Sequence, residues 1–70
     1  MNKIDEQIEN NFTYHPPKEG QVELYNLIRR SAKQFAIDIN NVAVDSREKS
    51  VALTKLEEAV MWANAAIARN

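Results

Sequence analysis

The stretch from Asp45 to Asn70 constrains the fold more than any other part of the chain. It contains no proline and no glycine and is rich in Ala, Leu, Lys and Glu, so it predicts one long helix over residues 45–69. Asp45 is expected to cap the first free N–H groups of this helix. Glu48, three residues later, would complete a capping box.

The apolar residues of this helix predict contacts with more than one neighbour. One seam repeats at alternating steps of three and four residues and consists of Leu53, Leu56, Val60, Ala63 and Ile67. A second row lies beside it and consists of Ala52, Ala59, Trp62 and Ala66. Together the two rows form an arc that is wider than a two-helix hairpin needs.

A second helical pattern covers residues 21–42. Its apolar residues again step by three and four and are Tyr25, Ile28, Ala32, Phe35, Ile39 and Val42. Asn40 and Asn41 suit a helix end, and only a few residues separate this pattern from the long helix. Two helices with apolar seams and a short connection predict an antiparallel hairpin, hence an all-α fold in a single domain over residues 1–70.

The N-terminal part adds a short helix and a stiff loop. Residues 1–11 predict a helix with Ile4 and Ile8 on one side, ended by the Asn10–Asn11 pair, and so short a helix must dock on something. Residues 12–20 hold both prolines and the only glycine. The prolines fix the backbone, so this loop is expected to be extended and to be a plausible ligand lid.

The composition excludes several classes of protein. With no cysteine and one histidine, the 70-residue chain offers neither a disulfide nor a zinc ligand set, and we expect no cofactor. The formal charge of −1 comes without a basic stripe, which argues against a DNA or RNA partner. No run is apolar enough for a membrane span or a signal peptide, so we expect a soluble intracellular protein. So small a core favours self-association.

The residues that catalysis would need are scattered. Three serines accompany one histidine, His15, which lies in the stiff loop. Glu57 and Glu58 are adjacent, so their side chains point to different faces of a helix and fit a solvated ion-pair surface better than a catalytic pair. The sequence predicts that the protein is not an enzyme.

Anion binding is better supported, at two places. The start of the long helix offers free N–H groups together with Ser46, Arg47, Lys49, Ser50 and Thr54, a set that suits a phosphate. The alternative is that Ser and Asp serve only as caps and that Arg47 pairs with Glu48 or Asp45.

The second candidate combines the loop aromatic Tyr14 with Arg29 and Arg30. Such a ring can stack on a base while an arginine holds a phosphate. The alternative is that Tyr14 packs on a neighbouring helix and the arginines stay in solvent. Trp62 is expected in the core or in a subunit interface.

Three segments together resemble a known family. They are the loop YHPPKEGQ at Tyr14–Gln21, the arginine at Arg29 and the run from Asp45 to Asn70. They are similar to the small phage anti-CBASS sponge proteins, whose helical-hairpin domain is shared with an anti-Thoeris sponge family. The similarity covers Phe12 to Asn70.

The resemblance implies a non-enzymatic homo-hexamer that acts in the cytoplasm of the infected bacterial host. It would bind cyclic dinucleotides between two protomers and cyclic trinucleotides where three protomers meet, without cleaving them. The resemblance assigns Tyr14 to purine stacking and Arg29 to the phosphates. His15, Pro16 and Lys18 complete that dinucleotide site, and the trinucleotide site would use Arg47, Ser50 and Thr54. The other hypothesis is a helical scaffold or protein-interaction module with no nucleotide ligand.

Overall fold

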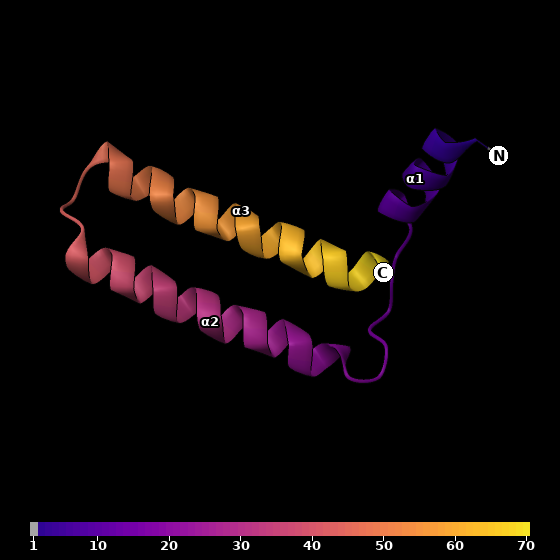
Figure 1. Cartoon of the computed structure of the whole chain (residues 1–70), viewed down its shortest axis with the longest axis horizontal. Helices are drawn as coiled ribbons and strands as arrows, with labels where there is room; N and C mark the ends of the chain where they lie inside the picture. Colours follow the sequence, from indigo (N-terminus) through magenta and orange to yellow (C-terminus); the bar gives the residue numbers. More distant parts are fainter. Residues whose placement is uncertain (1) are drawn as a thin grey trace.

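The computed structural model describes residues 2–70 and contains three helices. They are α1 (Lys3–Phe12), α2 (Gln21–Val42) and α3 (Arg47–Arg69), and the described residues form no strand. Helices α2 and α3 lie antiparallel, side by side, joined by a short turn, while α1 lies apart beyond the other end (Figure 1). The prediction of an all-α antiparallel hairpin with a short N-terminal helix is confirmed. None of the three helices is long and apolar enough to cross a membrane.

The cap of α3 differs from the prediction. The N-cap is Ser46, whose Oγ accepts a hydrogen bond from the backbone N–H of Lys49 at 3.1 Å. The predicted capping box of Asp45 and Glu48 is therefore wrong, and the helix starts two residues later than expected. Asp45 instead accepts a hydrogen bond from the Nζ of Lys49 at 2.9 Å. Because an ammonium is a stronger partner than a backbone amide, the carboxylate is drawn away from the cap position.

The end of α1 also differs. The helix runs through the Asn10–Asn11 pair and ends at Phe12, with Thr13 as its C-cap. The hydroxyl of Thr13 donates to the carbonyl of Glu9, which satisfies one of the last free carbonyls. Asn2 caps the other end by accepting from the N–H of Asp5 at 2.8 Å.

The hairpin packs along one half-buried seam. On α3 all five predicted seam residues, Leu53 to Ile67, are half-buried, which confirms that seam. On α2 the prediction holds through Ala32 and again at Ile39 but is wrong at Phe35 and Val42, which are exposed. Their places are taken by Ala36 and Ala43. A straight helix has 3.6 residues per turn, so the face toward α3 drifts by one residue relative to a strict seven-residue repeat.

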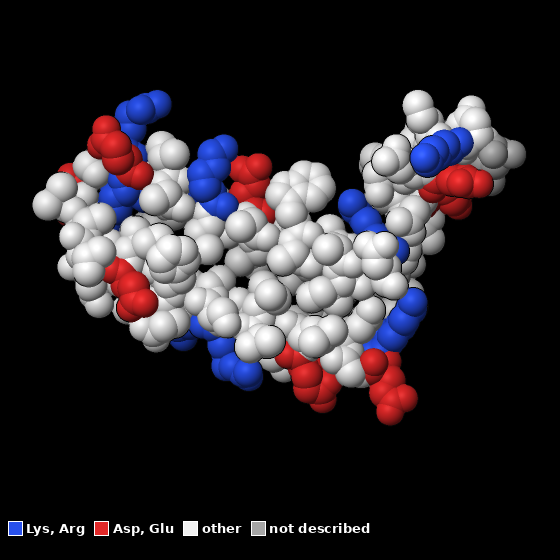
Figure 2. Space-filling view, viewed as in Figure 1, with Lys and Arg blue, Asp and Glu red and all other residues white. Residues whose placement is uncertain are grey.

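The single chain has no closed core. None of the residues 2–70 is buried, and large apolar side chains such as Phe35 and Trp62 remain more than half exposed. The chain exposes 5900 Å², whereas a compact monomer of its 8.0 kDa would expose about 4,500 Å². Figure 2 shows a largely uncharged face across the two helices, with most charged side chains at its edges. Trp62 is thus not part of a core within one chain.

Candidate functional site

A recess lies at the open end of the hairpin, where the start of α2 meets the end of α3. It measures about 350 Å³ and is lined in part by the loop that leads from α1 to α2. We call it the open-end recess; its lining residues are Asn11, Thr13, Tyr14, His15, Tyr25, Asn64, Ala65, Ala68 and Arg69. Its volume is at the lower end of the range for small-ligand sites.

A tight turn anchors the loop beside this recess. The N–H of Gln21 donates to the carbonyl of Lys18 at 3.0 Å, and Gly20 has φ 83° and ψ −15°. These angles are those of the third position of a type II turn, which strongly favours glycine. The loop is therefore held in one geometry where it joins α2.

The side chain of Gln21 ties this turn to α3. Its Oε1 accepts from the N–H of Lys18 at 2.9 Å, and its Nε2 donates to the carbonyl of Ile67 at 3.0 Å. The loop, the first residue of α2 and the last turn of α3 thus form one hydrogen-bonded unit. The residues of the recess are positioned by this unit.

Two loop residues have different roles in the structure. The side chain of Tyr14 is 80% exposed, so its ring does not pack on a neighbouring helix of the same chain; Arg29 and Arg30 are exposed, as that alternative expects. His15 is half-buried, and its Nε2 lies 2.7 Å from the carbonyl oxygen of Asn10. Donation from this nitrogen closes the C-terminal end of α1. The ring of Tyr14 is available for stacking, whereas one nitrogen of His15 already has a backbone partner.

The structure does not bring Tyr14 and Arg29 together within one chain. Arg29 is exposed on α2, donates from Nη1 to the Oδ1 of Asn26 at 3.0 Å and lines a different hollow. Pro16 and Lys18 lie in the loop beside the recess and are exposed. The five residues expected to bind a dinucleotide therefore divide between the loop and the middle of α2.

Sequence reasoning missed two polar residues in the recess. Arg69, in the last turn of α3, and Asn64, one turn and a half earlier, both line it. The Oδ1 of Asn64 is buried and accepts no hydrogen bond from residues 2–70. Antiparallel pairing could have identified both residues, because it places the end of α3 next to the start of α2 and the loop. A buried acceptor without a donor is rare in folded proteins, which makes Asn64 a candidate contact for a ligand.

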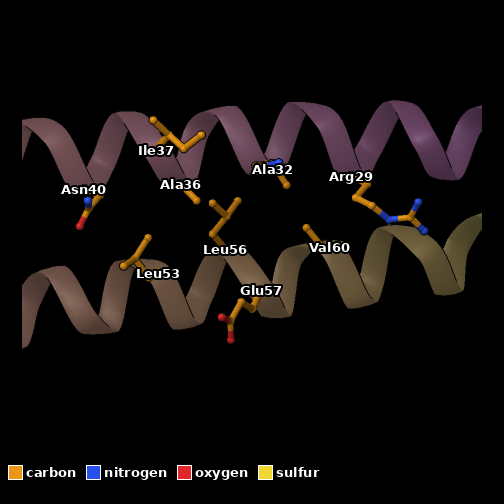
Figure 3. A pocket seen from close by; sticks show the side chains of 10 residues that line it. Arg29, Ala32, Ala36, Ile37, Asn40, Leu53, Leu56, Glu57 and Val60 are labelled. Atoms are coloured by element: carbon orange, nitrogen blue, oxygen red, sulfur yellow. The ribbon is translucent and has the colours of Figure 1, made fainter.

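A larger hollow, the interhelical groove, runs between α2 and α3 along the middle of the hairpin. It measures about 680 Å³. Its lining residues are Arg29, Ala32, Lys33, Ala36, Ile37 and Asn40 of α2 with Leu53, Leu56, Glu57 and Val60 of α3. Figure 3 shows Ala32, Ala36, Leu53 and Leu56 between the helices and Arg29 reaching toward α3 at one end. The groove is apolar along its floor, with charged groups on its rims.

The closed end of the hairpin, where residues 43–46 join α2 to α3, holds the residues expected at a trinucleotide site. Arg47, Ser50 and Thr54 are exposed on the first turns of α3. The other two polar residues of this region act within the fold, because Ser46 is the cap and Lys49 donates to both Asp45 and the carbonyl of Asn40. The alternative in which Asp45 holds Arg47 is wrong, since Asp45 pairs with Lys49 at 2.9 Å.

Glu57 and Glu58 are both exposed and point to different sides of α3, as the sequence predicts. Glu58 pairs with Lys55 at 3.4 Å, whereas Glu57 lines the interhelical groove. Among residues 2–70 no three histidine or carboxylate side chains gather in a way that could hold a metal ion.

Comparison with known families identifies the hairpin. The family model of the Acb2/Tad1 hairpin domain matches residues 4–68, nearly the whole chain. The chain belongs to the Acb2/Tad1 hairpin family. This confirms the resemblance to the anti-CBASS and anti-Thoeris sponge proteins and extends it from Phe12 back to Ile4, over most of α1. No curated protein and no solved structure matches this member of the Acb2/Tad1 family.

Proposed function

We propose that this Acb2/Tad1 hairpin protein is a phage sponge that binds cyclic di- and trinucleotide immune signals and sequesters them in the host cytoplasm without cleaving them. The observation that carries the proposal is the exposed ring of Tyr14 on an anchored loop, directly beside a recess with a cation and a buried, unpaired acceptor. A base stacks on an aromatic ring, and the amide of Asn64 can hydrogen-bond to it. Arg69 is available for a phosphate of the same ligand.

A dinucleotide pocket between two protomers accounts for the position of Arg29. Within one chain Arg29 lines the groove and not the recess. We infer that a second protomer supplies its Arg29 to the phosphates of a ligand whose base stacks on Tyr14. Two symmetric copies would then bring cations from both chains to a ring that carries two phosphates, which compensates for the near-neutral charge of each chain.

Exposed apolar surface supports the assembly that this pocket requires. The chain exposes about 1,400 Å² more than a compact monomer of its mass. A standard protein interface buries about 800 Å² per partner, so the excess is larger than one such contact requires. Phe35, Trp62 and the exposed alanines of the second row, Ala52, Ala59 and Ala66, would supply the apolar contacts of a homo-hexamer.

The trinucleotide part of the proposal concerns the closed end. The side chains of Arg47, Ser50 and Thr54 are exposed beside the N-terminus of a 23-residue helix, where backbone N–H groups and the helix dipole favour an anion. Three copies related by a three-fold axis would present these groups to the three phosphates of one ligand.

Binding without cleavage fits the positions of the groups that hydrolysis would need. His15, the only histidine, lies at the open end and contacts the carbonyl of Asn10, while Ser46 and Ser50 lie at the closed end. A nucleophile and its base must lie within hydrogen-bond reach of each other, and these do not.

The test is recovery of the ligand. The purified protein is incubated with cyclic GMP–AMP or a cyclic trinucleotide, freed of unbound ligand by gel filtration and then denatured, and the released material is identified by chromatography. We expect intact cyclic ligand in the protein fraction. Linear or hydrolysed product would contradict the sponge mechanism. Absence of any nucleotide from an oligomeric fraction would favour the alternative of a helical scaffold.

A further inference from the structure

We propose that α1 is an exchanged arm that docks into the interhelical groove of a second copy of the chain. The inference rests on the self-association proposed above and adds a specific contact to it. In the single chain α1 leaves three large apolar side chains uncovered: Ile4, Ile8 and Phe12, the last of them 86% exposed. A ten-residue helix is marginal in water by itself, so this one needs a surface to pack against.

The three apolar side chains form a single stripe on α1. They are spaced by four residues, which places them on the same side of a helix, one turn apart. The interhelical groove is the largest hollow of those described above, and its floor is made of alanines on α2 and leucines on α3. The small alanines allow another helix to approach closely. The stripe and the groove are therefore complementary in polarity.

The charges beside the stripe match the charges beside the groove. At 100° per residue, Asp5 and Glu9 lie along one edge of the Ile4–Phe12 stripe, whereas the opposite edge carries the neutral Gln7 and Asn11. The α2 wall of the groove carries two cations, Arg29 and Lys33. Asp5 and Glu9 are four residues apart on α1, and Arg29 and Lys33 are four residues apart on α2, so each pair is spaced by about one helical turn. An acidic edge with this spacing fits a basic edge with the same spacing.

The position of α1 selects a second copy as the partner. In Figure 1, α1 lies beyond the open end of the hairpin and extends away from it. The contact of His15 with the carbonyl of Asn10 and the hydrogen bonds of the Gln21 side chain to Lys18 and Ile67 fix the bend between α1 and α2. The groove lies between α2 and α3 and extends as far as Asn40 and Leu53. To enter the groove of its own chain, α1 would have to reverse its direction and break these contacts.

Cysteine cross-linking tests the contact, because the native chain contains no cysteine. Full-length Ile8→Cys carries a cysteine in the middle of the stripe, and full-length Ala36→Cys carries one on the groove floor. The two variants are given tags of different mass, mixed under conditions that allow subunits to exchange, and oxidised with diamide. The matched control replaces Ile8→Cys by Asn10→Cys, which lies on the opposite side of α1. Light scattering on each mixture gives the particle mass.

We expect a disulfide between the two differently tagged chains at a yield several-fold above the Asn10→Cys control. Equal yields on an intact oligomer would overturn the arm contact while leaving self-association in place. A third sample carries both Ile8→Cys and Ala36→Cys in one chain. A disulfide that forms only in this sample, as a cross-linked monomer, would show that the arm folds onto its own chain. A monomeric mass throughout would refute the proposed assembly itself, which separates that failure from failure of the arm contact.

A charge exchange tests the match between the two edges. Lys33 is used because Arg29 is also assigned to the ligand in the function proposed above. Glu9→Lys in the arm chain should lower the cross-link yield by about twofold to fivefold, the effect of one exposed ion pair. Lys33→Glu in the groove chain should then restore the yield toward its original value. No recovery in the exchanged pair would overturn the proposed alignment of the two edges.

Discussion

Polar side chains at the two ends of the hairpin differ in their hydrogen bonding. At the closed end Ser46 and Lys49 take part in four hydrogen bonds, and one of them, from the Nζ of Lys49 to the carbonyl of Asn40, joins α3 to α2. At the open end Tyr14 is exposed, and the Oδ1 of Asn64 is buried without a partner among residues 2–70. Polar groups that already have partners define the turn, whereas groups without partners are available to a ligand. The contrast therefore favours a structural role for Ser46 and Lys49 and leaves Tyr14 and Asn64 available to a ligand.

The largest effect is expected at Tyr14. Tyr14→Ala should weaken cyclic dinucleotide binding by about 1–3 kcal/mol per stacked base, which is roughly fivefold to 150-fold in Kd. The unfolding midpoint should stay the same, because the ring is 80% exposed and contributes little to packing. Calorimetric titration and a thermal scan measure the two quantities. Tyr14→Phe is the control, because it keeps the aromatic ring. If Tyr14→Ala lost trinucleotide affinity to the same extent as dinucleotide affinity, the two sites would not be separate.

The next effect concerns the cation in the open-end recess. Arg69→Gln should weaken dinucleotide binding by about 1.5–3 kcal/mol if one charged hydrogen bond to a phosphate is lost. Arg29→Gln should do the same through the second protomer. Binding that depends on Arg29 but not on Arg69 would mean that the recess of one chain does not hold the phosphate. Arg30→Gln, on an exposed position outside both hollows, is the matched control.

A smaller effect is expected at the closed end, and on stability alone. Ser46→Ala removes the N-cap of α3 and should lower the free energy of unfolding by about 1 kcal/mol. Dinucleotide affinity should not change, because Ser46 lies at the other end of the hairpin. Chemical denaturation at matched protein concentration measures the first quantity, since the stability of an oligomer depends on concentration. A loss of dinucleotide affinity in the folded variant would remove the separation between the two ends.

The smallest effect is a pH dependence at Asp45. The Nζ of Lys49 donates to this carboxylate and holds the pKa of Asp45 below its ordinary value. A carboxyl whose pKa is lowered by folding stabilises the folded state above its unfolded pKa, and this contribution is lost as the pH falls through the folded pKa. Asp45→Asn should therefore be slightly less stable than the native protein near pH 7, and the difference should vanish in strong acid. A difference that stays unchanged far below the ordinary pKa of an aspartate would contradict the assignment.

Much of the hairpin could be predicted from the sequence because local rules determine it. The seam of α3 follows directly from the spacing of Leu53, Leu56 and Val60. The errors arose where two local rules competed. Asp45 and Ser46 are both good caps, and the choice between them depends on Lys49, which reaches back to the carbonyl of Asn40. A strict heptad predicts Phe35 in the seam, but the face of a straight helix drifts over three turns and brings Ala36 there.

The candidate site was less accessible to sequence reasoning because it depends on contacts between distant segments. Tyr14 stands out in the sequence as an aromatic beside two prolines. Asn64 and Arg69 do not, since an asparagine and a terminal arginine are ordinary residues on a helix. Their role becomes visible only when the hairpin brings the end of α3 to the loop and Gln21 ties them together.

The central claim is that several chains assemble to form shared sites for cyclic nucleotides. The most direct test is calorimetric titration with a cyclic dinucleotide and, separately, a cyclic trinucleotide, with the molar mass measured by light scattering on the same sample. We predict a particle of hexamer size that binds tightly at fewer than one ligand per chain. An oligomer that gives no heat with either ligand, or a monomer that binds one ligand per chain, would contradict it.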